Sequence, residues 1–231
     1  MKRVGHKGAD LVAPGNTVAS FEAALKHGVD MIEFDVLRLR DRRLVLAHDL
    51  EDAASREPLT LEEGLDHFAG EAYADVELDI DMKIPGYERE VVDGLVARGL
   101  ADRALISSFY LDSLDKVAAL APQIRRGLSV PRVRRDYTQT PLALPAYLLA
   151  RIIARVYLPG RIRALMRAGR IQAVMSHWIL VNRRLVEAAH AEGGEVYVWT
   201  VDDARRIERL RALGVHAVIS NDPRLFATPQ V

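Results

Sequence analysis

Acidic side chains lie at alternate positions in two short apolar segments of the sequence. Glu33 and Asp35 occur in the first segment, and Asp81 occurs in the second. Residues two apart in a strand point to the same face, so the first two carboxylates share one side of their strand. Converging carboxylates repel one another unless a cation neutralises them, and oxygen ligands without cysteine favour Mg2+ or Ca2+ over zinc. The sequence therefore predicts a divalent cation held by Glu33, Asp35 and Asp81.

Two histidines and two lysines stand at the ends of predicted strands. His6 ends the first strand and His48 ends a short hairpin strand. Imidazole titrates near neutral pH, so this pair suits general acid and general base catalysis, and the sequence leaves open which histidine plays which part. Lys7 and Lys83 supply positive charge suited to a phosphate. A cation, two histidines and a lysine together indicate metal-assisted cleavage of a phosphoester.

For other polar residues near these positions, we expect a structural role rather than a catalytic one. Asp79 and Glu77 share a face with Asp81 but lie deeper in the strand, so we expect them in a buried polar network. Asp49 is expected to orient a backbone or the neighbouring histidine. Asn221 and Asp222 are expected to form a turn and a helix cap.

Alternating strand and helix patterns predict the framework that positions these groups. We expect strands at residues 3–5, 31–37, 76–82, 104–107, 126–128, 173–176, 196–200 and 218–220, with 44–48 as half of a hairpin. We expect helices at residues 17–26, 60–68, 88–98, 111–120, from 142 onward, 182–192 and 203–213. Eight such units predict an α/β fold, a (β/α)8 TIM barrel, whose active site lies where the strands end. An open doubly wound sheet is the rival, and its glycine-rich dinucleotide turn is missing after the first strand.

Composition narrows the class of protein. The chain has 231 residues, no cysteine, and 32 basic against 32 acidic side chains. These values predict one domain over residues 1–231, with neither a disulfide framework nor a nucleic-acid partner. No apolar run approaches the roughly 20 residues of a membrane span, and no secretory signal is visible. We therefore expect a cytoplasmic protein; the sequence does not predict its oligomeric state.

A basic segment interrupts this neutral composition. Residues 131–170 contain nine arginines and one acidic residue, and an apolar stripe runs through 142–158. We expect an outer barrel helix whose stripe packs on the barrel, with a possible break at Pro159-Gly160. The alternative is an interfacial helix that contacts an anionic lipid surface.

Short motifs recur at the ends of the predicted strands along nearly the whole chain. They are Gly5-His6-Lys7-Gly8, Pro14-Gly15-Asn16-Thr17, Ile32-Glu33-Phe34-Asp35-Val36, His48-Asp49, Ile80-Asp81-Met82-Lys83, Ser107-Ser108-Phe109, Val198-Trp199-Thr200-Val201 and Ile219-Ser220-Asn221-Asp222-Pro223. In order and spacing these motifs resemble the signature of the glycerophosphodiester phosphodiesterase family. The most specific part of the resemblance is the His…Glu-x-Asp…His-Asp set within the first fifty residues.

The resemblance implies a phosphoric diester hydrolase of lipid and glycerol metabolism. Such an enzyme is a (β/α)8 barrel that uses a divalent cation to split glycerophosphodiesters into glycerol 3-phosphate and an alcohol. It implies that His6 and His48 are catalytic and that Glu33, Asp35 and Asp81 bind the metal. It also implies that Lys7 and Lys83 contact the substrate and that Trp199 lines the glycerol pocket.

Three positions depart from the family pattern. Lys7 stands where the family usually has Arg, and Gly15 stands where it usually has Glu. Asp81 replaces a usual Glu and has a shorter side chain. These departures bear on the identity of the substrate and on how the cation is held more than on the type of reaction.

Two further functions remain open on the sequence alone. The same site could act as a lysophospholipase D on lysophospholipids at a membrane surface. A catalytically silent barrel that binds a phosphorylated ligand is the other alternative, although the intact His, Glu, Asp, His set argues against it.

Overall fold

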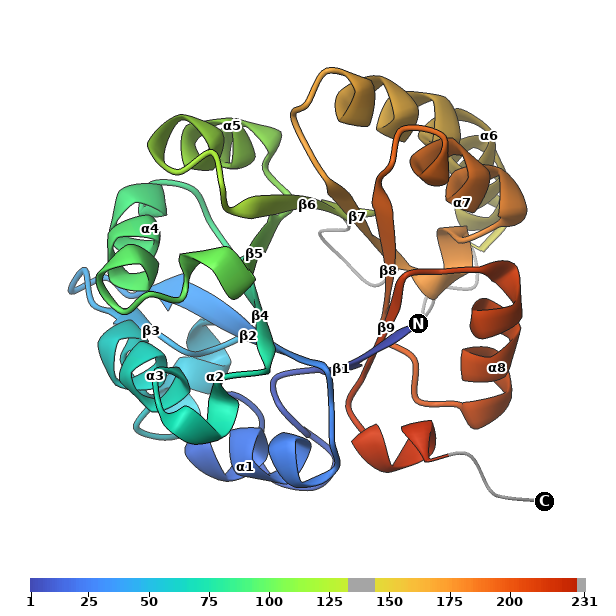
Figure 1. Ribbon diagram of the computed structural model, residues 1–231. Helices are drawn as coiled ribbons and strands as arrows, with labels where there is room; N and C mark the ends of the chain where they lie inside the picture. Colours follow the sequence, from blue (N-terminus) through green and yellow to red (C-terminus); the bar gives the residue numbers. More distant parts are fainter. Residues whose placement is uncertain (133–143, 228–231) are drawn as a thin grey trace.

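Eight strands of the described chain close into a parallel barrel with helices around it (Figure 1). The computed structural model describes residues 1–132 and 144–227. The strand order is β1-β9-β8-β7-β6-β5-β4-β2, and a β1–β2 pairing closes the ring, so the predicted TIM barrel is confirmed. The strands are β1 Lys2–Gly5, β2 Met31–Arg38, β4 Glu77–Met82, β5 Ala104–Ser108, β6 Arg125–Val130, β7 Ala173–His177, β8 Glu195–Trp199 and β9 Ala217–Ser220.

The main helices follow the predicted segments closely. They are α1 Val18–Lys26, α3 Leu61–Phe68, α4 Glu88–Ala97, α5 Leu111–Leu120, α6 Leu144–Arg167, α7 Arg183–His190 and α8 Ala204–Leu213. Local signals set several ends: Thr60 and Glu63 form a capping box at α3, and Gly214 ends α8 with a φ of 86°. Short 3-10 turns at Glu71–Tyr73, Ala101–Arg103, Trp178–Leu180 and Pro223–Phe226 complete the connections.

The segment after β2 differs from its prediction. The strand expected over 44–48 is only β3 Leu44–Val45, which pairs antiparallel with β2. A helix that the sequence analysis missed, α2 Leu50–Ser55, follows it. Asp49 begins this helix because its carboxylate accepts from the backbone N–H groups of Glu51 and Asp52.

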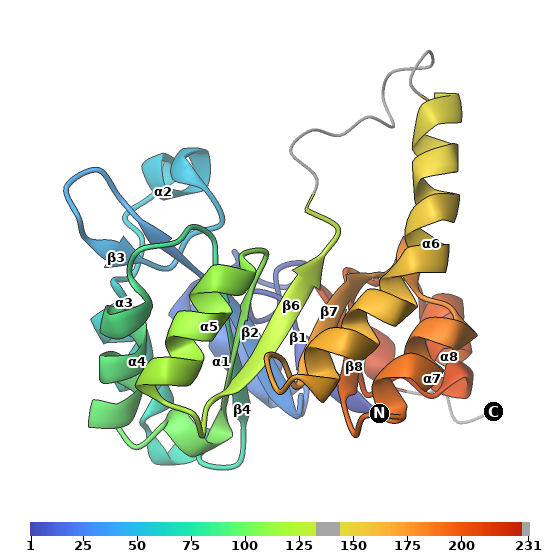
Figure 2. The same cartoon turned by 90° about the horizontal axis from the view of Figure 1, so that it is seen from above.

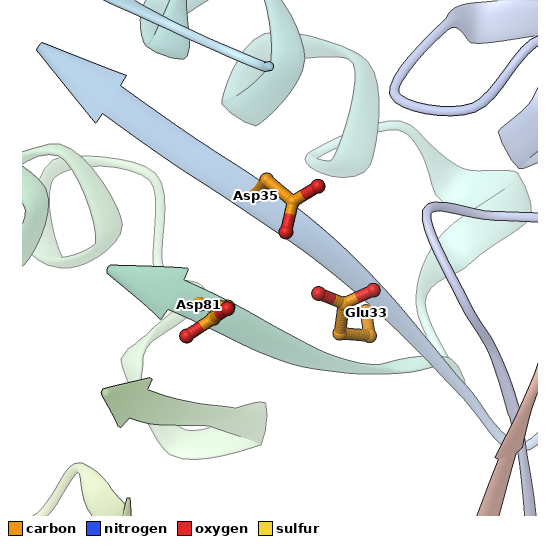
Figure 3. Close-up of side chains that lie close together, drawn as sticks. All are labelled: Glu33, Asp35 and Asp81. Carbon is orange, nitrogen blue, oxygen red and sulfur yellow. The ribbon is translucent and has the colours of Figure 1, made fainter. Parts of the chain in front are cut away.

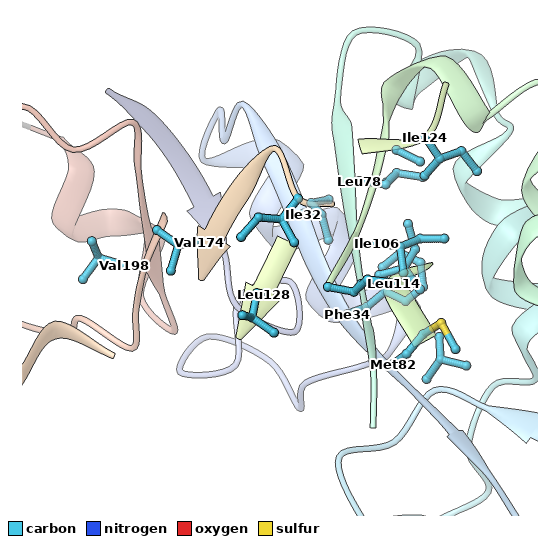
Figure 4. Close-up of a cluster of buried hydrophobic side chains, with 14 of the residues drawn as sticks. Ile32, Phe34, Leu78, Met82, Ile106, Leu114, Ile124, Leu128, Val174 and Val198 are labelled. Carbon is cyan, nitrogen blue, oxygen red and sulfur yellow. The ribbon is translucent and has the colours of Figure 1, made fainter. Parts of the chain in front are cut away.

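Alternate strand residues divide between an outer and an inner core. Outward-facing side chains such as Ile32, Phe34 and Leu78 pack against the helices (Figure 4). The inward-facing apolar residues form a separate cluster in the barrel, made of Val4, Met31, Leu105, Ala173, Met175, Tyr197, Ala217 and Ile219. Charged side chains occupy the barrel interior on either side of this apolar layer. Arg125 pairs with Glu77 and Glu195 at one end, and Glu33, Asp35 and Asp81 cluster at the other.

Helix α6 runs through Pro159 without the predicted break. A proline cannot donate to the carbonyl four residues earlier, here that of Arg155. The side-chain amide of Asn182 donates to that carbonyl instead, at 3.4 Å, and stabilises the helix at this point. No helix in the part of the chain that the structure describes is long and apolar enough to cross a membrane.

The N-terminal half of α6 extends beyond the barrel on the side where β6 ends (Figure 2). The prediction that the stripe in 142–158 packs on the barrel is wrong for Ile152 and Val156, both of which are 56% exposed. Ile153 and Tyr157 are exposed beside them, whereas Leu158 is buried. Residues 142 and 143, and the side chains of residues 144–151, lie outside the part of the chain that the structure describes.

Candidate active site

Three carboxylates converge where β2 and β4 end. Parallel pairing sets Glu33 beside Asp79 and Asp35 beside Asp81. One oxygen each from Glu33, Asp35 and Asp81 lies within 4.8 Å of the others, and the three side chains face one another (Figure 3). All three are buried, and Asp35 is completely so. The structure thus brings together the metal ligands that the sequence predicts.

The electrostatics of this cluster call for positive charge. Burial and the charge of Asp35 raise the pKa of Glu33 well above its usual range. Burial raises the pKa of Asp79 to about 8. Lys83 offsets part of the negative charge by ion pairs with Asp35 and, at 2.5 Å, with Asp81. Burial alone would raise the pKa of Asp35, but Lys83 and His6 hold it below its usual range.

The donor set fits a hard divalent cation. Asp81 Oδ1 is buried and has no hydrogen-bond partner among the described residues. Buried polar atoms are normally paired, so such an oxygen is available to a ligand. Three clustered carboxylates offer the oxygen ligands that Mg2+ and Ca2+ take.

His6 follows β1 and is mostly buried. Its Nδ1 lies 2.6 Å from the side-chain oxygen of Asn221, and its Nε2 lies 3.8 Å from the carboxylate of Glu33. Burial lowers the pKa of His6, partly opposed by Asp35 and the bond to Asn221. The ring is therefore neutral at neutral pH and can accept a proton.

His48 occupies an open position on the same cavity. Its side chain is 55% exposed, and its Nδ1 lies 3.0 Å from the carboxylate of Asp49. Asp49 thus orients this histidine, as the sequence analysis expected, and it also begins α2, which the sequence analysis did not expect. This contact holds the ring at the open side of the cavity.

The cavity between these groups is small. Its volume is about 150 Å³. Its lining contains six of the predicted site residues together with Asp79 and groups from the later strands: His6, Glu33, His48, Asp79, Asp81, Lys83, Ser107, Phe109, Ser129, Met175, Trp199, Thr200 and Ile219.

Trp199 forms part of the wall of this cavity, where the sequence analysis predicts it. The indole N–H donates to the carbonyl of Met175 at 2.8 Å, which fixes the ring. Phe109 meets it edge-on with ring centroids 6.2 Å apart, and the centroid of His177 lies 5.1 Å away. One wall is therefore rigid and aromatic, opposite the carboxylates on β2 and β4.

Lys7 does not line the cavity, unlike the other residues predicted to contact the substrate. Its ammonium pairs with Asp10 at 2.5 Å, while its backbone N–H donates to the carboxylate of Glu33. The side chain of Asp10 also fills the space next to Gly15, where a Cβ would lie 2.5 Å from its carboxylate. Lys7 and Gly15, both departures from the family pattern, thus belong to one local arrangement around Asp10.

Two asparagines support site residues in ways that the sequence analysis missed. The amide of Asn16 is fully buried and makes two bonds to Asp35, donating to its carboxylate at 2.8 Å and accepting from its N–H at 3.0 Å. Asn221, expected only in a turn, bonds His6. Asn16 and Asn221 could both have been found from their places in matched motifs. Asp79, expected in a buried polar network, is buried and also lines the cavity.

Known proteins resemble this chain along nearly its whole length. A model of the glycerophosphoryl diester phosphodiesterase family matches residues 6–57 and 51–225. The chain is 26% identical over 254 residues to a glycerophosphodiester phosphodiesterase of Caldanaerobacter subterraneus, covering 95% of this chain and 93% of that protein.

Solved structures show the same fold. A glycerophosphodiester phosphodiesterase from Parabacteroides distasonis superposes with a TM-score of 0.74 at 18% identity, covering 96% of this chain and 93% of that one. A phosphodiesterase from Oleispira antarctica, in complex with the product sn-glycerol-3-phosphate, superposes with a TM-score of 0.70 at 21% identity, covering 97% of this chain and 94% of that one.

Proposed function

The chain belongs to the glycerophosphoryl diester phosphodiesterase family, and from this membership and the site we propose that it hydrolyses glycerophosphodiesters to glycerol 3-phosphate and an alcohol. The observation that carries the proposal is that Glu33, Asp35 and Asp81 converge at the cavity that His6 and His48 also line, with Glu33 and Asp81 in its wall. Two statements remain predictions: residues 1–231 form one domain, and the protein is cytoplasmic.

The three carboxylates would hold Mg2+ or Ca2+. When bound, such a cation polarises a phosphoryl oxygen and offsets its charge. Asn16 holds Asp35 in place through two hydrogen bonds: its side-chain NH2 donates to the carboxylate of Asp35, and its side-chain oxygen accepts from the backbone N–H of Asp35. Lys83 contributes a buried positive charge at the same point and suits the phosphate.

The environments of the two histidines suggest their roles. Burial lowers the pKa of His6, so this neutral ring accepts the proton of the attacking oxygen, which is a water or the substrate's own glycerol hydroxyl. As the bond from phosphorus to the leaving oxygen breaks, His48, beside Asp49, gives that oxygen a proton. An exposed acid at the mouth suits a leaving alcohol that extends toward solvent.

The size of the cavity limits what it encloses. Its volume of about 150 Å³ is below the roughly 300–1,000 Å³ typical of pockets for drug-sized ligands. It therefore suits the phosphate and glycerol portion, with Trp199 against the glycerol carbons. The alcohol portion stays outside, so we expect tolerance toward different head groups.

A direct assay tests the proposal. We expect the protein to release glycerol 3-phosphate from glycerophosphocholine, measured with a coupled dehydrogenase, when Mg2+ or Ca2+ is present. Dialysis against EDTA should abolish turnover, and Glu33→Gln should require more cation, as calorimetry of cation binding would show. Full activity in EDTA would contradict the metal assignment. Inactivity on both this substrate and bis(p-nitrophenyl) phosphate would favour the silent barrel.

A second candidate function, a lysophospholipase D, is favoured by the exposed apolar face of α6. This face consists of Ile152, Ile153, Val156 and Tyr157, and it lies on the part of the helix that extends past the catalytic end. The exposed residues Arg183 and Arg184 begin α7, next to the point where Asn182 bonds α6. Apolar and basic side chains together suit an anionic lipid surface.

Vesicle binding and lipid hydrolysis test this candidate. Each arginine near an anionic surface contributes on the order of 1 kcal/mol, so co-sedimentation with phosphatidylglycerol vesicles should weaken in high salt. Val156→Ser should reduce binding and hydrolysis of micellar lysophospholipid. Val96→Ser, at a similarly exposed valine on α4, should change neither. Protein that stays in the supernatant at low salt would remove this candidate.

A further inference from the structure

A chain of hydrogen bonds connects His6 to the surface through two residues that the proposed chemistry does not use. The side-chain oxygen of Asn221, just after β9, lies 2.6 Å from Nδ1 of His6. The amide nitrogen of Asn221 donates to the carboxylate of Asp202 at 2.7 Å. Asp202 belongs to the segment between β8 and α8, so the chain joins three separate parts of the barrel.

Asp202 is itself held in position. Its other carboxylate oxygen accepts from the backbone N–H of Asn221 at 2.8 Å and from the hydroxyl of Ser220 at 2.9 Å. The carbonyl of Asn221 accepts from the N–H of Leu11 at 3.0 Å. Asn221 is thus fixed at its backbone and at its amide, and its side chain has little freedom to rotate.

The chemistry of these groups decides which way the amide points. An ionised carboxylate can only accept hydrogen bonds, so the NH2 group of Asn221 must face Asp202. The amide oxygen then faces His6, and an oxygen without a proton can only accept. Nδ1 of His6 must therefore carry the proton, which leaves the lone pair on Nε2, the nitrogen nearer to Glu33.

We propose that Asn221 and Asp202 are positioning residues that hold His6 in the tautomer with its free lone pair directed into the catalytic cavity. This inference rests on the proposed function in so far as His6 acts as the base. A base with its proton on the wrong nitrogen cannot accept another there, so tautomer control affects the rate directly.

The role expected of Asn221 from sequence, a turn before Pro223, is filled by its neighbour. The carboxylate of Asp222 accepts from the backbone N–H of Arg224 at 3.1 Å and begins the following 3-10 turn. The side chain of Asn221 makes no bond in that turn. Its side-chain contacts go to His6 and Asp202 instead.

Nitrogen NMR of His6 tests the proposal without relying on activity. In metal-free protein above neutral pH, we expect wild-type His6 to show a protonated Nδ1 and an unprotonated Nε2. Asn221→Ala and Asp202→Asn should each produce a mixture of tautomers. Asp203→Asn, the same change at the adjacent residue that begins α8, should leave the spectrum unchanged.

Kinetics provide the second measurement. Loss of tautomer control in a catalytic triad lowers the rate by up to about 10⁴-fold. For half-buried Asn221 and exposed Asp202 we expect kcat to fall about tenfold or more, with KM little changed. In the double variant Asn221→Asp/Asp202→Asn, a carboxylate at position 221 can accept from both His6 and the amide at position 202. This double variant should restore the tautomer of His6 with its proton on Nδ1. It should also move the acid limb of the pH–rate profile to higher pH, because a neighbouring carboxylate favours the protonated imidazole.

The outcomes separate this proposal from the proposed function. A single tautomer and unchanged kcat in both single variants would overturn the positioning role, as would a changed tautomer with unchanged kcat. If wild-type protein hydrolyses no phosphodiester while both single variants still change the tautomer, the proposed function fails and tautomer control by Asn221 and Asp202 stands.

Discussion

The two ends of the barrel interior are both charged, but they are built differently. At the N-terminal end, Arg125 pairs with Glu77 and, at 3.3 Å, with Glu195, while Lys2 also pairs with Glu77. His216 lies 3.2 Å from Glu195. Acids and bases are thus balanced there. At the catalytic end, the four carboxyls of Glu33, Asp35, Asp79 and Asp81 face the single ammonium of Lys83.

The pKa directions at the two ends record this difference. Burial would raise the pKa of Glu77, but hydrogen bonds from Lys2 and Arg125 lower it below its usual value. At the other end burial raises the pKa of Glu33, and Asp35 and Asp79 raise it further. Paired carboxylates at the N-terminal end stabilise the fold, whereas the catalytic end keeps more carboxylates than Lys83 can neutralise, which suits a cationic ligand at a cost in stability.

The largest expected effect is on activity and is confined to the catalytic end. His6→Ala and His48→Ala should each lower kcat by about a hundredfold or more, as loss of a general acid or base does. Their melting temperatures should stay near the wild-type value, because neither ring belongs to the apolar core. Near-native rates in both variants would show that the histidines are structural. The rate should also fall on both sides of a pH optimum.

The N-terminal end should show the opposite response. Arg125→Met leaves Glu195 and Glu77 short of a partner and should destabilise the fold by about 1–3 kcal/mol. For a chain of this size that lowers Tm by about 2–4 °C per kcal/mol, while kcat stays unchanged.

Arg163→Met is the matched control for this change. Arg163 pairs with Glu192 on the surface, where its side chain is 50% exposed, so the loss of stability should be clearly smaller than for Arg125→Met. Equal destabilisation by the two variants, or a lower kcat for Arg125→Met at a temperature where it is folded, would break the distinction between the two ends.

The smallest effect is the pH dependence of stability. Because the folded pKa of Asp79 is raised to about 8, its contribution is complete below its unfolded pKa and is lost as pH rises through the folded value. Glu33 acts in the same direction. The lowered pKa of Glu77 does the reverse: its contribution is present above its unfolded pKa and is lost as pH falls through the folded one.

Calorimetry without metal should therefore show Tm falling by a few degrees from about pH 5 to about pH 9. Mg2+ or Ca2+ should raise Tm more at the higher pH, since ionised carboxylates bind a cation more tightly. A cation effect that is equal at both pH values would mean that the raised pKa values do not come from the cation site.

Periodicity and local signals in the sequence predicted most of the fold. The alternation of Ile32, Phe34 and Val36 with Glu33 and Asp35 places the acids inside the barrel, since apolar side chains must face the helices. The capping box at α3 and the glycine after α8 are local, and both are observed. Helix α2 was missed because only six residues form it and its beginning depends on how Asp49 is placed.

What the sequence by itself determined is which polar side chains face the barrel interior and the strand ends, because strand periodicity and motif spacing depend on neighbouring residues. Which groups support them was decided by the tertiary structure. Asn221 lies 215 positions from His6, and only closure of β9 onto β1 makes them neighbours. The same closure, with Asp10 beside Lys7, decides that the ammonium predicted to bind substrate is paired elsewhere. Contacts between distant segments leave no local pattern in the sequence, so these roles appear only once the barrel has closed.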